Sequence, residues 1–220
     1  KVHSMKLLFN ANIHTLDKSH PQASAMLIDG GRILAVGGKD TLESISHGRV
    51  DRQDMGGRTI LPGLIDAHLH LQHYGLSLQK VDCETKTKAE CLRRVAERAQ
   101  KAKPGAWILG HGWNQNEWTD ESAFPAAAEL DAIAPNNPVY LTAKSLHMGW
   151  ANTAALQRAS ITNDTPDPKN GAIQRDDKGR VTGILLETAM SLVEKTIPDP
   201  SISEIESAIE KAQSILWKMG

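Results

Sequence analysis

The stretch Leu61-Pro62-Gly63-Leu64-Ile65-Asp66-Ala67-His68-Leu69-His70 is the most informative part of the chain. Successive side chains of a β-strand point to opposite faces, so Asp66, His68 and His70 would share one face of an extended segment. Two imidazoles spaced in this way can bind one divalent metal ion, and the adjacent carboxylate can orient one of the rings from behind. We therefore predict a strand over residues 64–70 with a metal site at its carboxyl end.

Upstream of this stretch the sequence is typical of β-structure. Two apolar runs, residues 26–28 and 33–36, flank Asp29-Gly30-Gly31, which suits a hairpin turn with positive φ. Further strand-like runs lie at residues 7–9, 50–54 and 59–61. We expect residues 1–60 to form a separate β-rich portion.

Downstream, strand-like and helix-like segments alternate. Helix starts are predicted from capping boxes at Thr87 and Ser203, from Pro125 in a first turn and from a cap at Asn152. The last helix is predicted to have one apolar face, because its apolar residues keep helical spacing: Ile205, Ile209, Ala212, Leu216 and Met219. Short apolar strands are predicted at residues 107–109 and 139–141, and a hairpin over residues 171–186. This alternation indicates an α/β fold with a parallel sheet or a (β/α) barrel.

Chain length limits how much of a barrel is present. A (β/α)8 barrel usually takes roughly 250 residues, whereas the whole chain has 220. We predict that residues 61–220 are the first half of such a barrel, incomplete in this chain. A small independent sheet is the alternative.

Composition excludes several classes of protein. Hydrophobic residues make up 40% and charged residues 23% of the chain, which is ordinary for a globular domain and excludes disorder. The formal net charge of -1 argues against nucleic acid or an anionic membrane as a partner. The sequence has no apolar run long enough for a membrane span and no signal-peptide pattern, so we expect a cytoplasmic location. Cys83 and Cys91 are predicted to be half-buried thiols.

Several motifs together resemble one family. Residues 61–70 resemble the PGxIDxHxH signature of the metal-dependent amidohydrolase superfamily. Residues 110–118 are similar to the GxGWDQxxW stretch of its branch of N-substituted formamide deformylases and YtcJ-like proteins. Further segments of that branch resemble residues 130–139, 147–156 and 171–187. The resemblance implies a barrel preceded by a small β-sandwich, to which residues 1–60 would contribute.

The resemblance also implies a ligand set. His68 and His70 correspond to metal ligands. Glu187 matches a glutamate whose carboxylate could bind or bridge the metal, and we predict it as a catalytic residue as well. Lys144, as a carboxylated lysine, is the competing bridge. The remaining ligands of the family, two histidines and an aspartate, would lie beyond residue 220. We therefore expect this chain to be inactive by itself.

Other residues are candidates for substrate contact. His147 follows a predicted strand and could stabilise an oxyanion as a catalytic residue. Trp113 and Trp118 either wall the substrate pocket or pack beneath it. His111 lies between two glycines in what we interpret as a strand-end loop, where a substrate contact and a structural role are both open.

These features predict a metal-dependent hydrolase that cleaves carbon–nitrogen bonds of amides or substituted formamides with a metal-activated hydroxide. The expected cofactor is a divalent metal, zinc above all, as one or two ions, and the partner is a small-molecule substrate. The rest of the polypeptide or an oligomer is a further expected partner. Two alternatives remain: a non-catalytic fragment or regulatory relative, and a deaminase or cyclic-amide hydrolase of the same superfamily.

Overall fold

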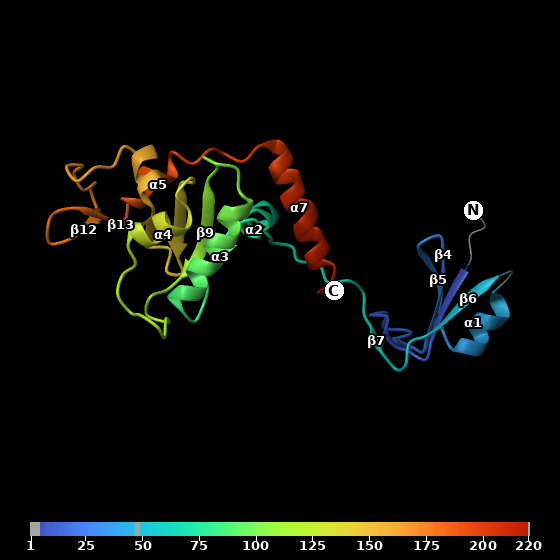
Figure 1. Cartoon of the computed structure of the whole chain (residues 1–220). Coiled ribbons are helices and arrows are strands. Elements are labelled where there is room, and N and C mark those ends of the chain that lie inside the picture. The colour runs from blue at the N-terminus through green and yellow to red at the C-terminus, as the bar shows by residue number, and fades with distance from the viewer. Residues whose placement is uncertain (1–4, 47–48, 220) are drawn as a thin grey trace. The chain divides into compact units, whose positions relative to one another are not determined.

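The structure is a computed structural model that describes residues 5–46 and 49–219 (Figure 1). It divides into two compact units, an amino-terminal unit that ends at Leu69 and a carboxy-terminal unit over His70–Met219. The division into domains at residues 1–60 and 61–220 stays a prediction.

Short strands dominate the amino-terminal unit. Its elements are β1 (Met5–Phe9), β2 (Asn12–His14), β3 (Gln22–Ala23), β4 (Ala25–Asp29), β5 (Arg32–Gly37), α1 (Lys39–Ile45), β6 (Val50–Asp54) and β7 (Thr59–Ile60). They form two sheets with strand orders β5-β4-β1-β6 and β3-β2-β7. The predicted hairpin is confirmed as β4 and β5, and Gly30 and Gly31 take φ of 54° and 78° at its turn. Leu7, Leu27 and Leu42 are buried in the core of this unit.

The strand predicted over residues 64–70 is absent, so that prediction is wrong. The structure assigns no strand to this segment. Strands require a hydrogen-bonded neighbour, and within the described part of the chain no strand pairs with these residues. Leu64 and Ile65 are consequently 76% and 93% exposed. The apolar residues of this segment suit a strand, but its own sequence does not specify which other strand it would pair with.

A single mixed sheet forms the centre of the carboxy-terminal unit. Its elements are α2 (Leu71–Ser77), β8 (Val81–Asp82), α3 (Lys88–Lys101), β9 (Ile108–Trp113), α4 (Ala127–Ile133), β10 (Val139–Ala143), β11 (Met148–Ala151), α5 (Thr153–Arg158), β12 (Gly171–Arg175), β13 (Val181–Glu187), α6 (Met190–Glu194) and α7 (Ile202–Leu216). The strand order is β12-β13-β11-β10-β9-β8. β8, β9 and β10 are parallel, whereas β11 is antiparallel to both of its neighbours.

This sheet differs from the uninterrupted parallel series that the half-barrel prediction implied. The described residues form an α/β fold without a closed barrel. Residues 144–147 alone join β10 to β11, and residues 176–180 alone join β12 to β13. Links this short allow antiparallel pairing only, because a parallel crossover needs a dozen or more residues.

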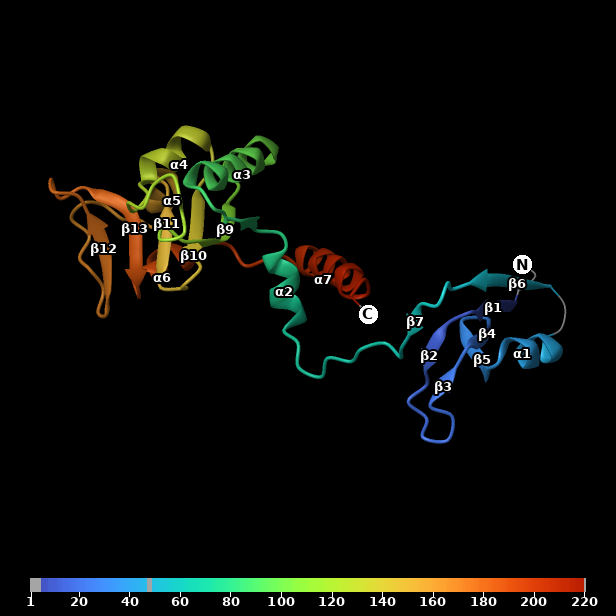
Figure 2. The ribbon, with the colours of Figure 1, turned by 90° about the horizontal axis from the view of Figure 1, so that it is seen from below.

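Side chains on both faces of the sheet are buried: α3 and α4, which lie side by side in Figure 2, contribute to one core. α5 and α6 contribute to the other core, which the first residue of α4, Ala127, also reaches. Neighbouring residues of one strand enter different cores: Leu141 packs with the α3 side and Tyr140 with the α5 side. Ile184 and Leu185 alternate in the same way on β13. The strand period of two therefore explains why these strands are apolar throughout.

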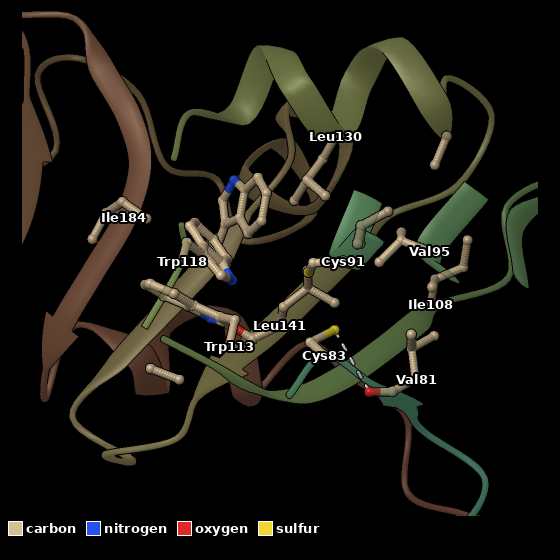
Figure 3. Close-up of a cluster of buried hydrophobic side chains, with 14 residues drawn as sticks. Val81, Cys83, Cys91, Val95, Ile108, Trp113, Trp118, Leu130, Leu141 and Ile184 are labelled. Atoms are coloured by element: carbon tan, nitrogen blue, oxygen red, sulfur yellow. Dashed lines mark hydrogen bonds between the residues drawn. The ribbon is translucent and has the colours of Figure 1, made fainter. Parts of the chain in front are cut away.

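Three tryptophans fill the core on the α3 side (Figure 3). The Trp113 ring lies 6.1 Å from the rings of both Trp118 and Trp150. Cys83 and Cys91 lie in the same cluster as free thiols, and both are fully buried rather than half-buried. The hydrogen bond with Cys91, together with burial, raises the pKa of the Cys83 thiol, so Cys83 stays protonated and is no nucleophile.

Two helices far apart in the sequence pack on each other (Figure 1). α2 precedes the sheet and α7 follows it, and Gly75 of α2 meets Ala208 of α7. A Cβ atom on Gly75 would lie 2.6 Å from the Ala208 carbonyl oxygen, so only glycine allows this approach. α7 begins two residues earlier than predicted, because Ser201 and Glu204 form the capping box. Within the described residues, no helix has the length and apolar content needed to span a membrane.

Candidate functional site

One edge of the sheet brings together three of the polar candidates, Lys144, His147 and Glu187. β13 runs in the same direction as β8, β9 and β10, because β11 reverses the direction twice. The carboxyl ends of these four strands therefore meet at one edge, which is where α/β proteins place their ligand sites. Glu84 follows β8, Lys144 follows β10 and Glu187 ends β13. The β10–β11 turn, residues 144–147, lies at the same edge and contains His147.

His147 and Glu187 are in direct contact although they lie 40 positions apart in the sequence. Nδ1 of His147 is 3.1 Å from Oε2 of Glu187. Their backbones are joined as well, because the Glu187 N–H donates to the His147 carbonyl oxygen at 3.0 Å. Both side chains are solvent-accessible, 67% and 56% exposed. The structure thus brings together the two residues that the sequence proposed as catalytic.

The backbone of Glu187 is strained. Its φ is 52°, in the left-handed region that costs an ordinary residue about 1–2 kcal/mol. Gly171 lies opposite it in the β12–β13 ladder, and a Cβ atom there would come within 2.5 Å of the Ala189 backbone nitrogen. A glycine on the partner strand therefore makes room for the turn. Strain of this kind persists where the surrounding structure imposes it, and such positions cluster at functional sites.

Lys144 links three strand-end segments. Its Nζ atom lies 2.7 Å from Oε1 of Glu84 and 3.4 Å from Oε1 of Glu117. The hydrogen bond that Lys144 donates to the Glu84 carboxylate is the main cause that raises the pKa of Lys144. Carboxylation of a lysine requires the neutral amine, which this environment disfavours; the bridging roles of Lys144 and Glu187 both stay predictions. The sequence interpretation missed Glu84 and Glu117. It predicted no strand at residues 81–82, so nothing local marked Glu84 as a residue near a strand end.

The loop between β9 and α4 is attached to the start of α3. Asp120 accepts the backbone N–H of Lys88 at 2.8 Å and that of Ala89 at 3.0 Å. The Lys88 side chain is nearly buried and forms ion pairs with Glu121 and Glu129. These contacts hold the loop that carries Glu117 to a rigid helix end.

The histidines of the sequence motif lie on either side of the unit boundary. In the amino-terminal unit, Asp66 Oδ1 accepts the backbone N–H of His68 at 3.0 Å. In the carboxy-terminal unit, His70 is the N-cap residue of α2, and its ring stacks 5.7 Å from that of His73. All three motif residues, Asp66, His68 and His70, are exposed. Their roles as ligands and as an orienting carboxylate stay predictions.

The remaining candidates lie deeper. Trp113 is fully buried and donates its indole N–H to the Leu141 carbonyl oxygen at 2.9 Å. Trp118 is 5% exposed, and its indole nitrogen has no hydrogen-bond partner within the described residues. His111 lies inside β9, paired with Thr142, and not in a strand-end loop. The structure shows these three side chains packed within the unit. Their contact with substrate stays a prediction.

The side chains at the carboxyl edge of the sheet include atom types that bind divalent metal ions. An imidazole nitrogen and a carboxylate oxygen, as in His147 and Glu187, are both ligands that zinc accepts. Residues 5–46 and 49–219, however, contain no group of three or more His, Cys, Asp or Glu side chains that could hold a metal ion. The described residues therefore supply suitable donors but no complete coordination shell.

Comparison with known proteins identifies the family. A model of the amidohydrolase family matches residues 52–220. The chain belongs to the amidohydrolase family. This match confirms the predicted family.

The amidohydrolase relatives are longer than this chain. It is 39% identical to Protein LONG AFTER FAR-RED 3 of Arabidopsis thaliana over 97% of this chain and 36% of that protein. It is 37% identical to the N-substituted formamide deformylase of Arthrobacter pascens over 85% of this chain and 35% of that enzyme. A solved structure of an uncharacterized metal-dependent hydrolase from Pyrococcus horikoshii matches 99% of this chain and 41% of its own, with 29% identity and a TM-score of 0.65. The chain thus spans well under half the length of these relatives.

Proposed function

We propose that this amidohydrolase cleaves the carbon–nitrogen bond of amides or substituted formamides with the help of a divalent metal ion, zinc in the first place. The observation that carries the proposal is the contact of 3.1 Å between His147 and Glu187 at the carboxyl edge of the sheet. The identity of 37% to an N-substituted formamide deformylase supports the choice of substrate class.

His68, His70 and Glu187 are the residues that would hold the metal. When bound, such an ion lowers the pKa of water and polarises the substrate carbonyl group. Glu187 uses Oε2 for His147, which leaves Oε1 available as a ligand. One carboxylate could therefore serve both the metal and the histidine.

His147 acts on the substrate through its other ring nitrogen. The Glu187 carboxylate faces Nδ1, so a proton on that atom would complete the hydrogen bond between them. Nε2 is then the atom left to meet the substrate. In the imidazolium form, Nε2–H donates a hydrogen bond to the oxyanion that develops on the carbonyl carbon.

We further propose that polypeptide outside the present sequence completes both the ligand shell and the fold. In this proposal the sheet of the carboxy-terminal unit is part of a (β/α)8 barrel, and the amino-terminal unit contributes to a small β-sandwich. The exposed side chains of Leu64 and Ile65 support it, because adjacent large apolar side chains are normally covered. The limited share of each relative that the chain spans supports it as well.

The test uses the complete protein that carries this sequence, loaded with Zn²⁺. We expect the His68→Ala/His70→Ala double variant to lose bound metal, measured as moles of zinc per mole of protein. Glu187→Gln should lower kcat/KM for formate release from N-substituted formamides by at least about a hundredfold, the scale of a lost catalytic group. Glu210→Gln, on the exposed face of α7, is the matched control and should change neither quantity.

Two results would overturn the proposal. One is stoichiometric zinc retained by the double histidine variant. The other is full activity of Glu187→Gln at an unchanged thermal unfolding midpoint.

A further inference from the structure

The turn that carries His147 also holds an unusual leucine. Leu146 lies between β10 and β11, directly before His147, and its backbone N–H donates to the Ala143 carbonyl oxygen at 3.0 Å. Its φ is 64°, in the left-handed region, and its side chain is 72% exposed. A large apolar side chain is thus held in a strained conformation and in contact with water.

Local stability does not account for this residue. Glycine takes the left-handed conformation without steric cost, and asparagine tolerates it far better than leucine does. An exposed leucine gains little from burial to offset the strain. When no neighbouring contact compensates for backbone strain, the strained residue is a candidate for contact with a ligand.

The other side chains of the turn, residues 144–147, indicate what kind of ligand group Leu146 could contact. Lys144 is engaged with the carboxylates of Glu84 and Glu117. His147 is engaged with Glu187. Ser145 is polar, and its Oγ accepts the His147 N–H at 3.3 Å. Leu146 is therefore the apolar side chain of this turn, and it adjoins the residue assigned to the carbonyl carbon.

We propose that Leu146 is a specificity-determining residue that contacts an apolar substituent on the substrate nitrogen. The inference rests on the proposed function, because it assumes that the scissile bond lies at His147. It adds the residue that selects among such substrates and the direction of its preference, an apolar nitrogen substituent over a polar one.

The experiment compares two formamides that differ only at the end of the nitrogen substituent. N-hexylformamide and N-(2-hydroxyethyl)formamide are assayed with the complete zinc-loaded protein and with its Leu146→Asn and Leu146→Gly variants. We expect wild type to prefer the hexyl compound in kcat/KM and both variants to lose at least about tenfold of that preference, the scale of burying a leucine side chain. Their thermal unfolding midpoints should equal or exceed that of wild type, because both residues relieve the strain.

Leu16→Gly is the matched control. Leu16 is likewise a leucine with a left-handed φ, 60°, and a side chain that is 77% exposed, but it lies in the amino-terminal unit. This variant should raise the unfolding midpoint in the same way and leave the substrate preference unchanged.

The outcomes separate the two proposals. Active protein whose preference is the same in wild type, Leu146→Asn and Leu146→Gly overturns the role of Leu146 and leaves the proposed function standing. A zinc-loaded wild type that releases formate from neither compound overturns both.

Discussion

Glu187 shows how a single residue is placed against its own conformational preference. The side chain reaches His147, yet the backbone takes a φ of 52° that a glycine would adopt without cost. The extended strand β13 ends at this residue, and the left-handed turn there changes the direction of the chain before α6. The strain is therefore local to the residue that we assign to chemistry.

A stability measurement tests this strain. We expect Glu187→Gly to be more stable than Glu187→Ala by about 1 kcal/mol, because both variants lack the carboxylate and only glycine removes the steric cost. Urea unfolding of the chain measures the difference. Asn170→Gly is the control, since Asn170 has a φ of 62° and asparagine tolerates this region, so its stability should hardly change. A glycine variant less stable than the alanine variant would contradict the assignment of strain.

At the scale of elements, the start of α3 shows which signals are local and which are not. Thr87 accepts the Glu90 N–H as the sequence pattern predicted. Asp120 satisfies two more N–H groups of the same helix end from more than 30 positions away, and the sequence interpretation did not identify it. A cap such as Thr87 can be predicted from four consecutive residues. A cap such as Asp120 forms only when a distant loop folds back onto the helix end.

Asp120 makes this helix end sensitive to acid. The N–H groups of Ala89 and Lys88 hold the pKa of Asp120 below its usual range. The unfolded chain therefore takes up the proton first, so this stabilisation is fully present above about pH 4 and is lost as the pH falls toward the lowered pKa. We expect Asp120→Asn to be less stable than wild type at pH 7, with a gap that narrows below about pH 4.

Urea unfolding at a series of pH values measures this gap. Asp177→Asn removes an exposed carboxylate from the β12–β13 turn and should follow the wild-type profile. A gap for Asp120→Asn that is constant from neutral to acid pH would show that the carboxylate charge makes no contribution at this helix end.

On the scale of the whole molecule, the contact between α2 and α7 joins the two ends of the carboxy-terminal unit. Helical periodicity predicted an apolar face on α7, and Ile205, Ile209 and Ala212 are at least partly buried as expected. Met219, predicted on the same face, is 69% exposed. Close approach depends instead on the small residue Ala208 facing Gly75, which periodicity of large side chains does not detect.

Gly75→Ala tests this contact by the sign of its effect. Replacing glycine with alanine inside a helix ordinarily stabilises by about 1 kcal/mol. Here the added methyl group would lie 2.6 Å from the Ala208 carbonyl oxygen, so we expect the chain to be destabilised and the amides of α7 to exchange faster with solvent. Hydrogen exchange followed by mass spectrometry measures the effect. Slower exchange in α7 than in wild type would contradict the packing.

Local sequence was enough to predict the features that depend on neighbouring residues: the β4–β5 hairpin, the Thr87 cap of α3, the Asn152 cap of α5 and the apolar face of α7. The second half of the predicted box at α3 does not form, because Glu90 binds Arg93 and Arg94 instead. The family motifs also identified His147 and Glu187 as candidates. Three features became visible only in the folded chain: the antiparallel course of β11, the absence of a strand at residues 64–70 and the contact between those two candidates. Pairing of strands and meeting of side chains depend on segments distant in the chain, and no local pattern of polarity specifies which distant segment arrives.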